Sequence, residues 1–242
     1  MSTVSKRIDY PTSDGKPRAE TDAHRAVIMD SIAILDDFYS DQPMVYVSGD
    51  LLLFYKEGDR RVHLAPDVFV VFDVEKRQRD NFLLWEERCG PQFVLEVTSK
   101  STRQVDIGKK HHIYQDVLRV PEYFLFDPLG EYLKPALKGY RLQGPDYQPI
   151  ASVDGRLPSD VTGFHLVANG KRLDFYDPRT RTVRKTPVAA ARETAQIERA
   201  GRERAEADRE RAEAGRERAE AELAELRAEL SRLRGGESEA SH

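Results

Sequence analysis

Two acidic residues have types and positions that suit chemistry on a charged substrate. Asp67 follows Pro66 at the start of an apolar run, and Glu96 interrupts a second apolar run at residues 93–97. An ionised carboxylate inside an apolar strand is unfavourable unless a cation or hydrogen-bond donors compensate it. If the two runs are neighbouring strands, both carboxylates can point into one pocket and hold a hard divalent cation such as magnesium.

A lysine on the helix that follows the second run completes this set. Asp106 and Lys110 are four residues apart, so they lie on one helix face and Lys110 can reach back to the carboxylates. A lysine in that place can position a nucleophilic water or neutralise charge on a phosphate in the transition state. Two carboxylates, a metal and a lysine together predict a site that cleaves phosphodiester bonds.

Each of these residues also has a simpler interpretation when it is taken alone. Asp67 could cap a loop at a strand start, Glu96 could pair with a buried arginine or lysine, and Lys110 could be a solvated helix residue. The order of strand, strand and following helix is more specific than any one of them. His111 and His112 are a weaker candidate, because adjacent side chains on a helix point apart.

The elements that must position these residues combine helices and strands. Apolar spacing predicts a helix that begins at Thr21 or Asp22 and a second helix over residues 103–118. Strand-like runs stand at residues 44–47, 51–55, 68–72, 93–97 and 122–126. The order predicts an α/β fold with a core of helix, three strands, helix and strand around a mixed central sheet. Four later segments, at residues 140–142, 147–150, 164–167 and 173–176, suggest an added antiparallel lobe.

The C-terminal part of the chain differs in composition. Residues 1–186 carry nearly all the aromatic and β-branched side chains, whereas residues 187–242 are mostly Ala, Glu and Arg. Three near-identical units of seven residues fill positions 201–221, and four leucines follow at coiled-coil spacing, Leu223, Leu226, Leu230 and Leu233. When the same spacing is continued toward the N-terminus, the positions in line with these leucines alternate between arginine and alanine. The chain therefore divides into a domain and a helical tail, which is either a solvated single helix or a helix that self-associates through its leucine end.

The composition of the 242-residue chain limits which kinds of partner and which cellular compartment we expect. The formal net charge of −4 gives no global attraction to nucleic acid, which counts mildly against a nucleic-acid substrate. The one cysteine, Cys89, excludes an internal disulfide framework and suits a reducing compartment. No apolar run approaches the roughly 18 residues that a membrane span needs, and the first residues lack the apolar region of a signal peptide. We therefore expect a cytoplasmic protein with no membrane partner.

Several segments resemble the Uma-two family of restriction-endonuclease-like proteins, within the PD-(D/E)XK nuclease superfamily. These segments are PDVFVV from Pro66, FVLEVTSKSTR from Phe93, DIGKK from Asp106 and VPEYFLFDP from Val120. The resemblance covers roughly residues 10–142. It implies the same core of helix, three strands, helix and strand.

The resemblance also implies roles for the candidate residues. Asp67 and Glu96 match the acidic pair that binds Mg²⁺ or Mn²⁺. The usual lysine of the superfamily stands two residues after the glutamate, where this chain has Thr98. Lys110 matches the family's helical lysine and takes that role, with Lys100 as the alternative.

These observations favour a magnesium-dependent endonuclease that acts on DNA, with Asp67, Glu96 and Lys110 as catalytic residues. A second hypothesis is a catalytically silent module that binds nucleic acid or protein and assembles through its C-terminal helix. A third is a scaffold in which Glu96 is only salt-bridged. Glu20, just before the first helix, is a candidate additional acidic member of the site. A homodimer is expected if the leucines pair, and the choice between DNA and RNA stays open.

Overall fold

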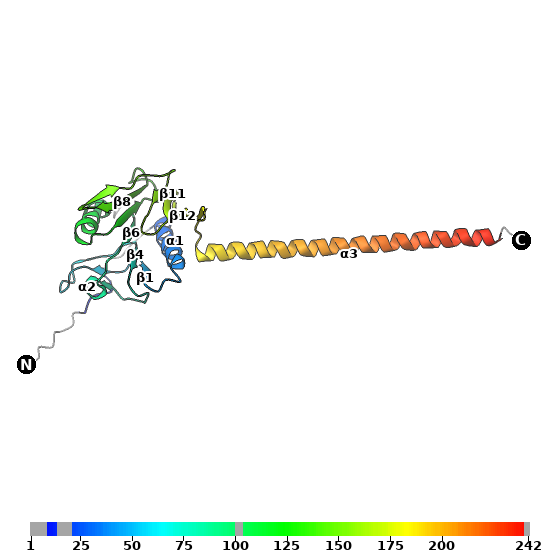
Figure 1. Cartoon of the computed structure of the whole chain (residues 1–242), viewed down its shortest axis with the longest axis horizontal. Coiled ribbons are helices and arrows are strands. Elements are labelled where there is room, and N and C mark those ends of the chain that lie inside the picture. The colour runs from blue at the N-terminus through cyan, green and yellow to red at the C-terminus, as the bar shows by residue number, and fades with distance from the viewer. Residues whose placement is uncertain (1–8, 14–20, 100–103, 240–242) are drawn as a thin grey trace, which may run out of the picture. The chain divides into compact units, whose positions relative to one another are not determined.

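The computed structural model describes residues 9–13, 21–99 and 104–239, and the chain divides into two compact units, Met1–Pro187 and Val188–His242 (Figure 1). Among the described residues, the first unit holds all the strands and every helix but the last. The described part of the second unit is one long helix.

A six-stranded mixed sheet forms the centre of the first unit, in the order β1-β4-β6-β7-β8-β9. These strands are β1 (Val45–Ser48), β4 (Val68–Phe72), β6 (Phe93–Val97), β7 (Glu122–Phe126), β8 (Leu137–Gln143) and β9 (Asp146–Pro149). β6 and β7 are parallel, and all the other neighbours are antiparallel. Because parallel neighbours need a crossover connection, the chain between β6 and β7 passes across one face of the sheet.

The crossover carries a helix at residues 104–117 that is wound as a π-helix in two stretches, η1 (Val105–Lys110) and η2 (Ile113–Val117). The backbone N–H of His111 donates to Asp106 O, and that of Leu118 donates to Ile113 O, both five residues back. The helix expected at residues 103–118 is therefore present, with a wider winding than the pattern indicated. Such π-helical turns are rare and occur frequently at functional sites.

One face of the main sheet is covered by α1 (Asp22–Phe38) and by a second sheet. Thr21 begins α1, since its Oγ1 accepts the N–H of His24 at 3.2 Å. Val27, Ile28 and Leu35 of α1 pack on this face of the sheet. The second sheet has the order β10-β11-β12-β13 and consists of Leu157–Pro158, His165–Asn169, Arg172–Asp177 and Thr182–Val183. Its apolar side chains join the same core.

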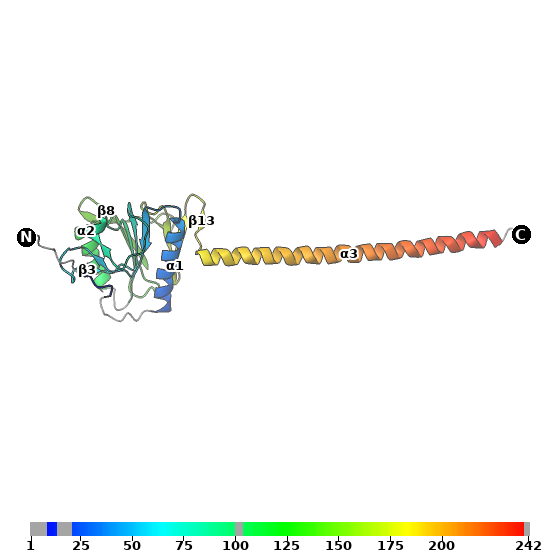
Figure 2. The same ribbon diagram turned by 90° about the horizontal axis from the view of Figure 1, so that it is seen from below.

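The opposite face is covered by the crossover helix and a small three-stranded sheet. Ile113 and Tyr114 pack into this second core. The small sheet has the order β3-β2-β5, made of His63–Leu64, Leu53–Phe54 and Phe82–Leu83, and α2 (Leu84–Glu87) follows β5. Figure 2 shows the main sheet between α1 on one side and the region of β3 and α2 on the other.

The sheet pairing differs from the sequence expectation in two places. The run expected at residues 51–55 forms only β2, in the small sheet rather than in the main one. The four segments expected as one antiparallel lobe divide between two sheets, because β8 and β9 extend the main sheet beyond β7. Local alternation predicts that a segment is a strand, whereas its partner is chosen by contacts with distant residues.

The second unit is α3 (Pro187–Glu239), a helix of 53 residues. Its described side chains are nearly all exposed, and ion pairs such as Arg199–Glu203 at 2.9 Å run along its surface. Each such pair contributes only about 0.2–0.5 kcal/mol. Leu223 and Leu226 are 48% and 56% exposed. Within the described ranges, α3 included, no helix combines the length and apolar character needed to cross a membrane.

Candidate active site

Asp67 stands at the start of β4 and is fixed by three other elements. Its Oδ2 accepts the backbone N–H of Val97, at the end of β6, at 2.7 Å. His24 Nε2, in the first turn of α1, lies 3.6 Å from the same oxygen. The turn after β1 approaches the backbone so closely that a Cβ on Gly49 would lie 2.1 Å from Asp67 O. The Asp67 carboxylate is therefore held directly beside the strand that carries Glu96.

Glu96 lies on β6 and is completely buried. Lys110 Nζ donates to its Oε2 at 2.7 Å, and the Tyr114 hydroxyl donates to its Oε1 at 2.6 Å. Both donors come from the crossover helix. The helix thus presents a cation and a hydroxyl to the glutamate that interrupts the apolar strand.

Lys110 contacts a second carboxylate as well. Its Nζ lies 3.2 Å from Asp106 Oδ1, one helical turn earlier, and 3.5 Å from the carbonyl oxygen of Ala65. Asp106 is fully buried, and its own carbonyl accepts the Tyr123 hydroxyl at 3.0 Å. The structure therefore brings Asp67, Glu96 and Lys110 together as the sequence predicted, and adds Asp106.

The surroundings shift the pKa values of both acidic candidates. Burial raises the pKa of Glu96 well above its usual range, against the charge of Lys110, and the neighbouring carboxylates add to the rise. Burial also acts to raise the pKa of Asp67, but the contact with His24, the charge of Lys110 and the N–H of Val97 outweigh it and lower that pKa. Glu96 is thus the carboxylate that gains most from an added positive charge.

The two donors to Glu96 keep their protons. Burial acts to lower the pKa of Lys110, but the charges of Glu96, Asp67 and Asp106 raise it above its usual value, so the amine stays an ammonium. Burial, and after it the charge of Glu96, raises the pKa of Tyr114 well above its usual value. Its hydroxyl therefore remains a hydrogen-bond donor.

The side chains around Lys110 fit a hard divalent cation by charge and donor type. Asp67, Glu96 and Asp106 are three buried carboxylates, and Lys110 supplies one positive charge against them. Within the part of the chain that the structure describes, no three or more His, Cys, Asp or Glu side chains form a ready set for a metal ion. Magnesium needs less than that, since it is commonly held by one or two carboxylates and keeps several waters.

Some residues of the site were not assigned a role from the sequence. Asp106 was placed on the same helix face as Lys110, and His24 lies one turn before Ile28 on the buried face of α1, so helical spacing was the available signal for both. Thr98, where the superfamily has its lysine, is buried, and its Oγ1 has no hydrogen-bond partner among the described residues. The alternatives Lys100 and Glu20 fall outside the described residues.

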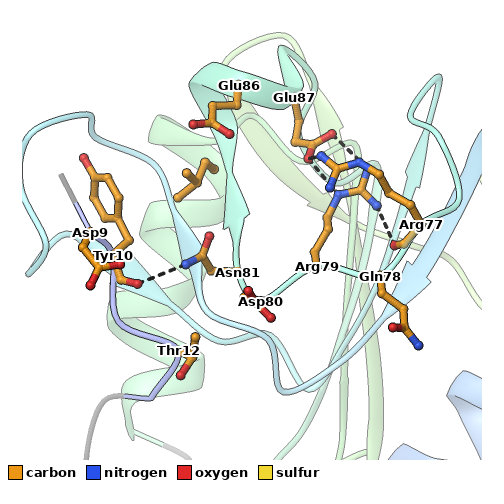
Figure 3. A pocket seen from close by; sticks show the side chains of 11 residues that line it. Asp9, Tyr10, Thr12, Arg77, Gln78, Arg79, Asp80, Asn81, Glu86 and Glu87 are labelled. Carbon is orange, nitrogen blue, oxygen red and sulfur yellow. Dashed lines mark hydrogen bonds and ion pairs between the residues drawn. The ribbon is translucent and has the colours of Figure 1, made fainter. Parts of the chain in front are cut away.

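A cavity of about 580 Å³ lies elsewhere, beside α2 and residues 9–13, the described part of the N-terminal leader (Figure 3). Its size is typical of ligand pockets. Three of its charged side chains pair with one another, because Glu87 accepts from Arg77 at 2.7 Å and from Arg79 at 2.7 and 2.9 Å. The leader is anchored there by Tyr10, whose carbonyl accepts from Asn81 at 3.3 Å. This geometry favours a structural role for the cavity lining.

Comparison with known proteins adds family information to this geometry. The model of the Uma2 family, described as "Putative restriction endonuclease", matches residues 4–168. Among solved structures, a crystal structure of "a putative nuclease belonging to DUF820" from Anabaena variabilis ATCC 29413 is similar, with 16% identity and a TM-score of 0.44 over 62% of this chain and 81% of that one. No curated protein sequence matches the chain significantly.

Proposed function

Because the chain belongs to the Uma2 family, we propose that it is a divalent-metal-dependent endonuclease that hydrolyses phosphodiester bonds of DNA. The observation that carries this proposal is the buried group of three carboxylates around Lys110. Among the described residues, three carboxylates face one lysine, and taking charges out of water costs several kcal/mol per ion, so a framework that served stability alone gains little from this group. A site that binds a divalent cation does need several carboxylates close together.

The roles of the residues follow from their contacts. Asp67 and Glu96 would hold Mg²⁺ or Mn²⁺ through carboxylate oxygens, and such an ion, when bound, activates water and neutralises phosphate charge. Lys110 stays protonated, so its ammonium can stabilise the negative charge that grows on the phosphoryl oxygens. Tyr114 and the N–H of Val97 keep the two carboxylates in position through their hydrogen bonds.

A catalytically silent binding module is the second candidate, and one observation favours it. Lys110 and Tyr114 together occupy both oxygens of Glu96. The formal net charge of −4 also gives the whole chain no attraction to a polyanion. In this alternative the site residues stabilise the fold and bind no metal.

A cleavage assay with matched variants distinguishes these functions. The full chain is incubated with supercoiled plasmid, labelled single-stranded DNA or labelled RNA, in magnesium, manganese or EDTA. Glu96→Ala and Lys110→Ala remove the proposed chemistry. Glu57→Ala and Lys56→Ala remove the same side-chain types from an exposed loop and serve as controls.

We expect metal-dependent nicking of DNA that both site variants lose and both loop variants keep. If only RNA is cleaved, the proposed substrate would change from DNA to RNA, and the proposed metal-dependent hydrolysis would stand. Nicking that survives Glu96→Ala would contradict the assignment of the site. If the chain neither cuts nor binds manganese, the silent module becomes the better description.

We further propose that the chain forms a parallel homodimer through the end of α3. With Leu223 and Leu226 at heptad positions a and d, Glu222 takes position g and Arg227 takes position e. In a parallel, in-register pair, Glu222 of one helix faces the partner's Arg227. Charge complementarity thus supports pairing with a second copy at the leucine end. Toward the N-terminus, the positions that would face the partner alternate between alanine and arginine, which disfavours pairing there.

Sedimentation of full-length variants tests the dimer without removing the helix. The wild-type chain should have a mass near twice 27.6 kDa. Leu226→Asp should be monomeric. Glu222→Arg and Arg227→Glu should each be monomeric alone and should pair when mixed. A monomeric wild type would rule the dimer out and leave the tail as a solvated single helix.

A further inference from the structure

Asp67 makes both of its side-chain contacts through one oxygen. The Val97 N–H lies 2.7 Å from Oδ2, and His24 Nε2 lies 3.6 Å from the same atom. Among the described residues, Oδ1 takes part in no hydrogen bond or ion pair. The carboxylate is therefore held by one oxygen and leaves the other for a ligand.

His24 is built into this position by the start of α1. Thr21 Oγ1 accepts its backbone N–H, which fixes the first turn of the helix. Its side chain is 3% exposed, whereas the next residue, Arg25, is exposed. Burying an imidazole is unfavourable compared with an apolar side chain of similar size, so packing alone gives no reason for histidine here. The contact with the Asp67 carboxylate gives a reason for histidine at this position.

Gly49 fixes the same residue from the backbone side. A Cβ at this position would lie 2.1 Å from Asp67 O and 2.7 Å from Ile32 Cδ1. The next residue, Asp50, donates its N–H to Pro66 O at 2.9 Å. Glycine therefore allows the turn after β1 to lie directly against the start of β4, which fixes the Cα from which the Asp67 side chain extends.

We propose that His24 is a positioning residue that, together with Gly49, orients Asp67 so that its Oδ1 is presented to the divalent cation. This inference rests on the proposed metal-dependent function. His24 acts through Asp67 and is not itself a metal ligand. The interaction is comparable to the carboxylates and carbonyls that orient the ligands of metal sites, whose loss weakens metal affinity by about 10–100-fold.

Manganese affinity, measured by calorimetry and by electron paramagnetic resonance without substrate, is the decisive readout. His24→Leu keeps the volume and removes the ring nitrogens, and we expect it to weaken Mn²⁺ binding by about 10–100-fold. His24→Gln places an amide nitrogen near the position of Nε2, and it should recover most of that loss. A residue that only packs α1 against the sheet would show the reverse order, because leucine packs better than glutamine.

Gly49→Ala gives a second test that leaves His24 in place. We expect weaker Mn²⁺ binding, because the added methyl displaces the backbone of Asp67. Gly108→Ala is the matched control, since a Cβ there meets nothing within 4 Å. It should bind Mn²⁺ like the wild type.

The outcomes separate this inference from the proposed function. If the wild type binds Mn²⁺ and His24→Leu binds it equally well, the positioning role is overturned and the metal site stands. If His24→Gln is no better than His24→Leu while both remain folded, the role is also overturned. If the wild type binds no Mn²⁺, the proposed metal dependence fails, and the positioning role fails with it.

Discussion

Glu96 and Glu122 are buried glutamates on neighbouring parallel strands, and their surroundings differ. Glu122 opens β7 opposite Phe93 of β6, and alternation turns the two glutamates to opposite faces of the sheet. Glu122 accepts two N–H bonds from Arg141, at 2.9 and 3.0 Å, and a hydrogen bond from Ser159 Oγ at 2.5 Å. The backbone N–H groups of residues 160 and 161 complete its shell, at 2.9 and 3.4 Å.

The donors around Glu122 therefore satisfy it, and among the described residues no other buried carboxylate contacts these donors. The nearby Asp160 shares Arg141 with it at 2.9 Å and is itself exposed. Glu96 instead shares Lys110 with the buried Asp106, 3.2 Å from Nζ, and the buried Asp67 adds to the negative charge around that lysine. Burial of a carboxylate is common to both sites, so burial alone does not indicate function. The balance of buried negative and positive charge is what distinguishes them.

The largest expected effect concerns catalysis at the unbalanced site. Glu96→Gln should slow DNA cleavage by at least about 10³-fold, or about 4 kcal/mol at the transition state, while the free energy of unfolding is unchanged or higher. The neutral amide removes a charge that burial already disfavours. Plasmid nicking and urea unfolding measure the two quantities. If a folded Glu96→Gln protein cuts at the wild-type rate, Glu96 is not catalytic, and the proposed functional difference between Glu96 and Glu122 is wrong.

Glu122→Gln should show the opposite combination. It removes the buried anion of Arg141, which keeps only the exposed Asp160, and should lower the free energy of unfolding by about 2 kcal/mol, within the range for a hydrogen bond to a charged group. Mn²⁺ affinity should stay at the wild-type value, measured below the unfolding transition. An altered affinity with intact stability would show that the Glu122 network also serves the metal site.

Tyr114→Phe should have an intermediate effect. It removes the 2.6 Å hydrogen bond to Glu96 Oε1 and changes little else, because the ring still fills its place in the core. We expect Mn²⁺ affinity to fall about 10-fold, as is typical when a partner of a metal ligand is lost. Titration of Mn²⁺ into the two proteins under the same conditions measures this. An unchanged affinity would mean that Lys110 alone orients Glu96.

The smallest effect is expected at Thr98, two residues after Glu96. Its buried hydroxyl has no hydrogen-bond partner among the described residues, so Thr98→Val should raise the free energy of unfolding by about 1 kcal/mol. Chemical denaturation measures this. Unchanged stability together with slower cleavage would instead show that the hydroxyl contacts the substrate.

The two glutamates also show how far the sequence alone predicts a site. Glu96 was recognisable because it breaks an apolar run, and Lys110 because its spacing from Asp106 places both on one helix face. Glu122 was not recognisable as a buried glutamate, because it stands at the edge of the apolar run at residues 122–126. Its hydrogen-bond partners also lie 19 to 39 residues further along the chain. Local periodicity predicted α1, the crossover helix, the helical tail and most strands, but not the short α2 at Leu84–Glu87. The sheet order, the π-helical winding and the contact of His24 with Asp67 depend on packing between distant segments.

The distant origin of the Glu122 donors has a consequence for biosynthesis. A nascent chain that has reached β7 carries a glutamate whose hydrogen-bond donors, residues 141 to 161, have not yet been made. The hydrogen bonds of the Glu122 carboxylate are therefore complete only after residue 161 has been added. At about 5–20 residues per second, translation of the 53-residue α3 that follows takes roughly 3–10 s. The long helix thus gives the domain time to fold while the chain is still attached to the ribosome.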